Sequence, residues 1–303
     1  MSKIAKGTIL TLVAGIAWGL SGTSGQYLMA HGFPVLVLTN VRLLIAGALL
    51  VLYMVLTNRR KLIEMIKDPK AMMPLALFAL LGLLLNQFAY LKSIYESNAG
   101  TATVLQYVCP VGILAYTCLK DRVAPTVTEV LSMILAVGGT FLIATHGQLN
   151  QLSVTPAGLF WGLFAAFTYA LYILIPIQLI KTWGSIPVIG VGMMLAGIVL
   201  TPFSGILRFH WQVSMKVYLA LAGIILVGTI LAYTLFLKGT SLVGPVKSSL
   251  LAAVEPISAV FFAFLIMHEQ FYLVDFAGMF MILSAVALIS IKDLILEKRK
   301  GIL

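Results

Sequence analysis

The sequence predicts an all-α membrane protein in which ten transmembrane helices form two inverted five-helix repeats around a central cavity. Of the 303 residues, 61% are hydrophobic and only 10% are charged, and the mean hydropathy is +1.06. The apolar residues come in blocks of about twenty, the length that crosses a bilayer as a helix. A stretch of the first half also resembles a stretch of the second half, which indicates a repeat.

The ten expected spans account for most of the chain. A soluble domain cannot hide this much apolar surface, and the connecting loops are short, so the function must lie within the helix bundle. The longest loop, residues 58–70, has room for a short surface helix. The spans centre near Gly19, Ala46, Leu81, Cys109, Leu135, Thr168, Ala196, Leu226, Ser258 and Leu283.

The basic residues predict the orientation of the bundle. With an internal N-terminus, Lys92, Arg208 and Lys216 lie outside, Arg42 lies within a span, and the remaining sixteen of the twenty Lys and Arg lie inside. By the positive-inside rule, both termini are then cytoplasmic and the chain is a multi-pass protein of the cytoplasmic (inner) membrane. Because this distribution accounts for the net charge of +10, nucleic-acid binding is not expected.

The internal repeat has an offset of 146 residues. Residues 89–110 align with residues 235–256, and five positions coincide, among them a Leu-Lys pair and a proline. The two repeats, 1–150 and 151–303, then hold five spans each, and an odd number reverses the second repeat in the membrane. Inverted repeats provide two related shapes that open one site to each side in turn, as in many secondary transporters.

Glu255 is the residue that most needs a function. It lies about 15 Å into its span, where a charge costs roughly 2.5 to 3.5 kcal/mol, and its counterpart in the first repeat is Cys109. Pro110 and Pro256 are each expected to kink their helix, and Pro256 frees a carbonyl near Ala252. Glu255 is therefore either a protonated residue hydrogen-bonded to a neighbouring helix, or a group that meets a substrate cation or carries a proton during transport.

Deep aromatic and amide side chains are the candidates for binding a substrate. Taken singly, each is explained as well by packing within the bundle, but together with one carboxylate they favour a shared cavity. Arg42, the other charge within a span, either forms a salt bridge, contacts an anionic substrate group, or reaches an interface. The candidates are Trp18, Gln87, Tyr90, Gln106, Tyr107, Tyr169, Tyr172 and Tyr233.

Several short motifs occur in a characteristic order: LVAGIAWGLSGTS (residues 12–24), Arg42, the pairs Leu91-Lys92 and Leu237-Lys238, and AAVEPISAV (residues 252–260). In this order and spacing the chain resembles, over essentially its whole length, the EamA-type members of the drug/metabolite transporter superfamily. The resemblance implies ten helices as two inverted repeats, cytoplasmic termini, and a central cavity for small metabolites, often amino acids. The chain departs from the family pattern at Cys109, the first-repeat position that matches Glu255, and after the fourth span, where Asp121 stands in place of the usual glutamate.

The sequence also contains no nucleotide-binding or hydrolase motif, so an enzyme, a cofactor or a bound metal is not expected. Aromatic side chains with one carboxylate suit a substrate that carries an ammonium group. The first interpretation is secondary active export of an amino acid or related amine, with protons as the coupling ion and the chain a monomer or weak homodimer in the bilayer. The alternatives are transport of a quaternary amine or other cationic metabolite, and a passive channel or membrane interaction protein.

Overall fold

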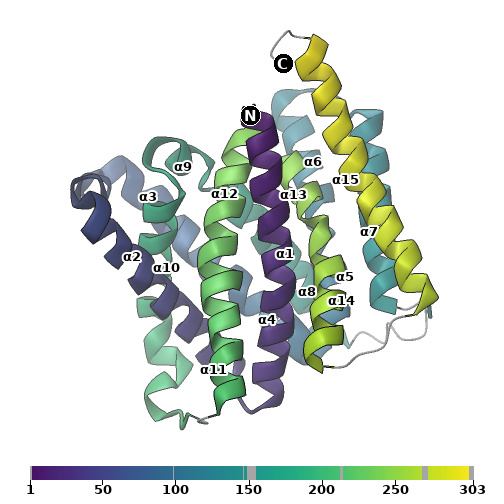
Figure 1. The fold of residues 1–303 in the computed structure, drawn as a ribbon. Coiled ribbons are helices and arrows are strands. Elements are labelled where there is room, and N and C mark those ends of the chain that lie inside the picture. Colours follow the sequence, from purple (N-terminus) through teal and green to yellow (C-terminus); the bar gives the residue numbers. More distant parts are fainter. Residues whose placement is uncertain are drawn as a thin grey trace.

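The computed structural model describes residues 2–97, 99–145, 147–148, 155–211, 214–267 and 272–299. All regular structure in these ranges is helical. The helices stand side by side, and α1 begins at the same end of the bundle at which α15 finishes (Figure 1). The expectation of an all-α protein is thus confirmed for the described part of the chain.

The two parts of the chain have a similar order of elements. The first part consists of α1 (Lys3–Ala30), α2 (Val35–Lys67), the continuous run α3–η1–α4 (Pro69–Leu77, Phe78–Leu84, Leu85–Glu96), the pair α5 and α6 (Ala99–Gln106, Cys109–Asp121) and α7 (Val127–Thr145). The second part consists of α8 and α9 (Pro156–Leu174, Ile177–Trp183), α10 (Ser185–Ser204) with the short η3 (Ile206–Arg208), the run α11–η4–α12 (Met215–Ala222, Gly223–Leu231, Ala232–Val243), the run α13–η5–α14 (Pro245–Leu251, Ala252–Val254, Glu255–Met267) and α15 (Leu273–Arg299).

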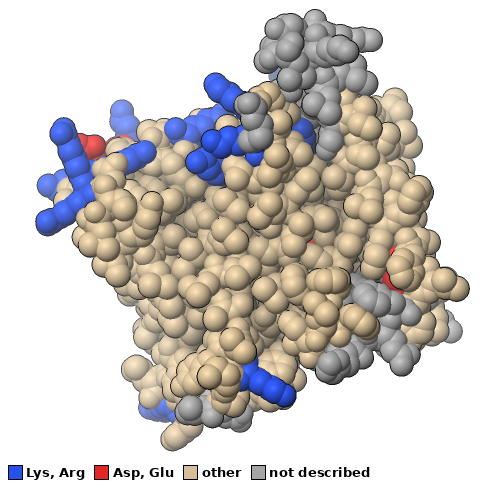
Figure 2. Space-filling model, in the orientation of Figure 1, with Lys and Arg blue, Asp and Glu red and all other residues tan. Residues whose placement is uncertain are grey.

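The helices suit a bilayer. Among the described residues, eight helical stretches are long and apolar enough to cross a membrane, and two shorter apolar helices accompany them. The face seen in Figure 2 has a broad belt without Lys or Arg, and most of its basic side chains gather at the end where α1 begins. A helical, multi-pass membrane protein is therefore confirmed, while the count of ten crossings and the inversion stay predictions.

The corresponding runs α3–η1–α4 and α11–η4–α12 each contain a π-helical segment, η1 in the first part and η4 in the second. Each segment crosses a facing helix at a glycine. A Cβ added to Gly82 would lie 3.0 Å from the Tyr172 Cα, and one added to Gly228 would lie 3.0 Å from the Ser21 Cα. Small residues let membrane helices approach closely, so α8 packs on η1 and α1 packs on η4 in matching ways.

The helices α2 and α10, which occupy corresponding places in the two parts, also meet at glycines. A Cβ on Gly47 would lie 2.9 Å from the Met194 Cα, and one on Gly197 would lie 3.0 Å from the Leu44 nitrogen. Each glycine thus admits the backbone of the other helix. The reciprocal contact fixes how α2 and α10 are rotated relative to each other, and with them the direction of the polar residues on α2.

The predicted surface helix in the loop from residue 58 to residue 70 belongs to α2. The backbone breaks at Asn58 (φ −155°, ψ 62°) and then continues as helix to Lys67. This segment carries Arg59, Arg60 and Lys61 at the basic end of the bundle.

Candidate functional site

Two helix breaks bring the central polar residues together. α5 ends at Gln106 and α6 begins with Cys109 and Pro110, while α13 passes through the 3-10 turn η5 before α14 begins with Glu255 and Pro256. In both places the proline stands in the first turn of the new segment, where its missing N–H removes no helical hydrogen bond.

Tyr107 connects the two breaks. Its hydroxyl donates to the carbonyl of Ala252, the region where the sequence places a carbonyl freed by Pro256. The same hydroxyl lies 3.4 Å from Oε2 of Glu255. A buried carbonyl without a partner is costly, so the phenol from the first break stabilises the second.

Glu255 is enclosed by phenols. Its side chain belongs to a residue only 6% exposed, and besides Tyr107 the Tyr90 hydroxyl interacts with its carboxylate. Tyr90 also forms a hydrogen bond of 3.1 Å with the hydroxyl of Thr103. The ion pairs found among the described residues, Arg60–Glu64 and Lys92–Glu96, leave Glu255 without a basic partner there.

Arg42, from α2, is also buried, with 4% exposure. Its Nε donates to Thr229 Oγ1 at 3.2 Å and its Nη2 to Ser21 Oγ at 3.4 Å. Thr229 in turn donates to the carbonyl of Ile224, five residues earlier, which is the spacing of a π-helix. Neutral hydroxyls therefore hold the guanidinium, and no carboxylate in the described part of the chain pairs with it.

Arg42 and Glu255 line the same cavity. Its volume is about 30 Å³, which is room for one or two water molecules. Tyr90 lines the cavity together with Arg42 and Glu255, and its hydroxyl interacts with the Glu255 carboxylate. The lining residues are Trp18, Ser21, Gly22, Arg42, Asn86, Gln87, Tyr90, Leu91, Gln106, Tyr169, Tyr233 and Glu255.

Trp18 is the centre of the aromatic wall. Its ring lies 5.5 Å from Tyr233 and 5.9 Å from Tyr169, both edge-to-face, and 4.7 Å from Phe236. These rings come from α1, α8 and α12, so the wall joins both parts of the chain. Edge-to-face contacts of this kind stabilise the fold beyond the contribution of burying their apolar surface.

The amides of the cavity differ in their pairing. Gln106 donates from Nε2 to Oδ1 of Asn86 at 3.5 Å. Gln87, which is 1% exposed, has no hydrogen-bond partner in the described part of the chain for either its Nε2 or its Oε1. The Tyr169 hydroxyl likewise has none there.

The cavity contains most of the predicted site residues, namely Trp18, Gln87, Tyr90, Gln106, Tyr169, Tyr233 and Glu255. Two predicted residues are not part of the lining. Tyr107 points to the helix breaks. Tyr172 is fully buried and packs on Phe78 at 5.9 Å and on the wall residue Tyr233 at 5.1 Å.

Four polar residues that line or support the cavity were not among the predicted site residues. Arg42 carried a signal, since a charge within a span is rare. Ser21, Asn86 and Thr229 are ordinary polar residues of membrane helices, and only the packing of η4 on α1 and of α4 on its neighbours reveals their place. Among the described residues, no three His, Cys, Asp or Glu gather as a metal site would require.

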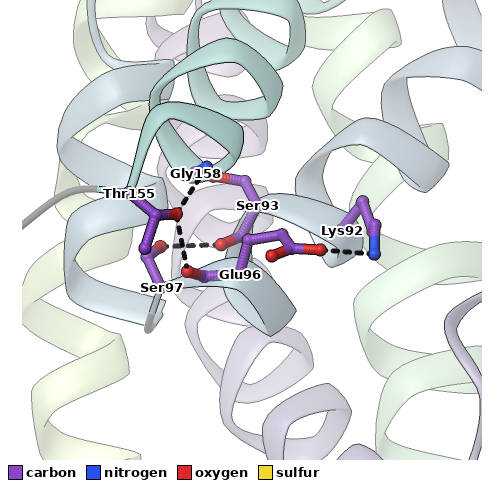
Figure 3. A network of polar contacts seen from close by, with 6 residues as sticks. All are labelled: Lys92, Ser93, Glu96, Ser97, Thr155 and Gly158. Carbon is purple, nitrogen blue, oxygen red and sulfur yellow. Dashed lines mark hydrogen bonds and ion pairs between the residues drawn. The ribbon is translucent and has the colours of Figure 1, made fainter.

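One end of the seam between α4 and α8 is closed by polar contacts (Figure 3). Thr155, the N-cap of α8, donates to the carbonyl of Glu96 at 3.3 Å and accepts from the Gly158 amide at 3.0 Å. Lys92 forms an ion pair with the Glu96 carboxylate. The helix that carries Gln87 and Tyr90 to the cavity is thus tied to the start of the second part of the chain.

Comparisons with known proteins place the chain among transporters. The model of the EamA-like transporter family matches residues 5–145 and 156–291. A protein of Salmonella typhimurium named "Uncharacterized inner membrane transporter YicL" is 37% identical over 292 residues, 96% of this chain and 97% of that protein. A protein of Bacillus subtilis named "Uncharacterized transporter YwfM" is 26% identical over 255 residues, 83% of this chain and 82% of that protein. A crystal structure of a protein 14% identical in sequence shares the fold, with a TM-score of 0.76 over 97% of this chain and 99% of that one.

Proposed function

The chain belongs to the EamA-like transporter family, and from this premise we propose that it exports an amino acid or a related amine across the cytoplasmic membrane by secondary active transport. One observation carries the choice of substrate. The Arg42 guanidinium and the Glu255 carboxyl group line one cavity, and neither has an ionic partner among the described residues.

A free amino acid fits this pair of charges. The guanidinium fork of Arg42 suits the substrate carboxylate, and the Glu255 carboxylate suits the ammonium group, because charge-assisted hydrogen bonds are the strong ones. The rings around Trp18 offer π faces to the same ammonium group. Each buried charge of the protein then gains its counter-charge from the substrate.

A quaternary amine or another purely cationic metabolite suits the cavity less well. Such a substrate would bring a second positive charge close to Arg42 and would leave the guanidinium without a partner. Like charges in a site of low dielectric repel strongly. The zwitterion is therefore the better candidate.

The size of the cavity and the two-part fold support alternating access. Sites for small molecules usually have about 300 to 1,000 Å³, whereas this cavity has about 30 Å³, so a substrate requires the helices around it to separate. In our proposal residues 1–150 and 151–303 are two inverted repeats of five spans each, which exchange shapes. The matching π segments η1 and η4 support it, because π-helical turns are frequent at functional sites and at helix kinks.

The proposed orientation places both termini in the cytoplasm. The support is the gathering of basic side chains at the end where α1 begins (Figure 2), together with the positive-inside rule. In the same proposal Glu255 is the group that takes up and releases the coupling proton, since it is the carboxylate that lines the cavity.

Counterflow in proteoliposomes tests the function. Purified protein is reconstituted with one unlabelled amino acid inside, and labelled amino acids are offered outside, one at a time. We expect transient uptake above the equilibrium level for the substrate, and accumulation against its gradient when a proton gradient is imposed. A passive channel would show neither, and a transporter of quaternary amines would exchange no amino acid.

A further inference from the structure

Gln87 is a buried polar side chain that the proposed function does not yet use. It extends from α4 into the cavity, one turn before Tyr90, and is 1% exposed. Neither its amide nitrogen nor its amide oxygen has a partner among the described residues. The other amides of the cavity, Gln106 and Asn86, are paired with each other.

A buried amide that lacks a hydrogen-bond partner costs free energy. Buried polar groups in folded proteins nearly always have a partner, either protein or ordered water. The cavity of about 30 Å³ has room for a water molecule on Gln87 when no substrate is bound. A ligand that displaces such water must replace its hydrogen bonds or lose affinity.

The Tyr169 hydroxyl adds a second free hydrogen-bonding group. Tyr169 lines the same cavity from α8, is 6% exposed, and its hydroxyl has no partner in the described part of the chain. Gln87 offers a donor and an acceptor, and Tyr169 offers a hydroxyl that serves as either. Neither group is needed for the two charges of an amino acid, because Arg42 and Glu255 serve those.

We propose that Gln87 sets the selectivity of the transporter: its amide, assisted by the Tyr169 hydroxyl, pairs with an uncharged hydrogen-bonding side group of the substrate. The transported amino acids then carry a hydroxyl or carboxamide side chain and are favoured over apolar ones of the same shape. This inference rests on the proposed function. A site built to hydrogen-bond a substrate group discriminates strongly against the analogue that lacks it, because its own polar groups are then left unpaired.

Pairs of amino acids with matched shape test this inference. The apparent kcat/KM for counterflow is measured for threonine against valine and for asparagine against leucine. The wild type should prefer the polar member of each pair by about tenfold or more. Gln87→Met keeps the length of the side chain but removes both hydrogen-bonding groups, and it should bring the ratio close to one or reverse it.

Two variants are matched controls for this ratio. Gln106→Met removes an amide of the same cavity that is already paired, and it should leave the polar-to-apolar ratio within about twofold of the wild type even if the rates fall. Ser93→Ala removes another buried hydroxyl without a partner from α4, at a position outside the cavity lining, and should also leave the ratio unchanged.

The outcomes separate this inference from the proposed function. Equal efficiency for both members of each pair in the wild type, or a ratio that Gln87→Met leaves unchanged, would overturn the role of Gln87 while amino acid transport stands. Failure to exchange any amino acid offered in the counterflow assay would overturn the proposed function itself. If Gln87→Met does not fold, thermal stabilisation of the wild type by threonine is compared with that by valine, because a ligand stabilises the state it binds. Greater stabilisation by threonine supports the inference, and equal stabilisation contradicts it.

Discussion

The two helix breaks at the centre of the bundle share an architecture but differ in chemistry. The break between α5 and α6 contributes Tyr107 and Cys109, whereas the break around η5 contributes the Ala252 carbonyl and Glu255. At the offset of 146 residues, Cys109 and Glu255 occupy the same position. The proline and the interruption of the helix belong to both breaks, and the charge belongs to one.

The same division holds between α2 and α10. These helices meet at Gly47 and Gly197, and five residues before these glycines stand Arg42 in one helix and Gly192 in the other. Each half thus supplies one charge at a position where the other half is uncharged. Shared features build the scaffold, and unshared residues give the cavity its chemistry.

The largest effect is expected from removing the carboxylate that only the second break carries. Glu255→Gln should lower kcat/KM for the amino acid by about 100-fold or more, because it removes the partner of a buried ammonium group, and it should abolish proton-driven accumulation. Cys109→Ala, at the corresponding position of the first break, should retain transport and accumulation. Equal losses in the two variants would mean that the breaks matter only as structure. Wild-type accumulation by Glu255→Gln would reduce the carboxylate to a packing group.

Arg42→Gln tests the other unshared charge. A hydrogen bond to a charged group contributes about 1.5 to 3 kcal/mol, so KM for the amino acid should rise about 10- to 100-fold. The methyl ester of the same amino acid keeps the ammonium group but has no carboxylate charge, and KM for it should change little. An equal rise in KM for the acid and the ester would show that Arg42 supports the fold and does not bind the carboxylate.

The shared scaffold responds to a different kind of change. Gly228→Ala places a methyl group against Ser21, and overpacking costs about 1 to 3 kcal/mol; the thermal unfolding temperature should fall by several degrees. Gly82→Ala, at the matching crossing of η1 and α8, should behave in the same way. Gly112 has no atom within 4 Å of an added Cβ, so Gly112→Ala serves as the control. If Gly228→Ala and Gly112→Ala unfold at the same temperature, the crossing at η4 is not as tight as described.

The seam between α4 and α8 should give the smallest effects. Thr155→Ala removes an N-cap and a contact to Glu96, which costs about 1 kcal/mol. Lys92→Met removes an ion pair near the surface and should cost less than about 1 kcal/mol. The free energies of unfolding of the two variants are the measurement. A larger loss of unfolding free energy in Lys92→Met than in Thr155→Ala would show that the ion pair, and not the contacts of Thr155, stabilises the seam.

The sequence predicts the helices and the prolines at their breaks because these depend on long apolar runs and on a missing N–H. It does not predict the π segments, since one extra residue in a helical turn leaves no local signature. Residues three apart also need not share a role. Tyr169 lines the cavity while Tyr172 packs on Phe78, because the rotation of α8 is set by its crossing with η1. The sequence does not predict the contacts of Arg42 either, because they depend on tertiary packing: Thr229 lies 187 residues away in the sequence.

Alternating access is tested most directly by the chemical accessibility of one cavity residue from both sides of the membrane. Ser21→Cys, in a protein with Cys109 and Cys118 replaced by alanine, places a single thiol on the cavity lining. A membrane-impermeant thiol reagent is applied to right-side-out vesicles and, separately, to inside-out vesicles, with and without the transported amino acid. We predict labelling from each side and slower labelling from both sides when the substrate is present. A thiol that reacts from the same side only, whatever the substrate or proton gradient, would contradict alternating access.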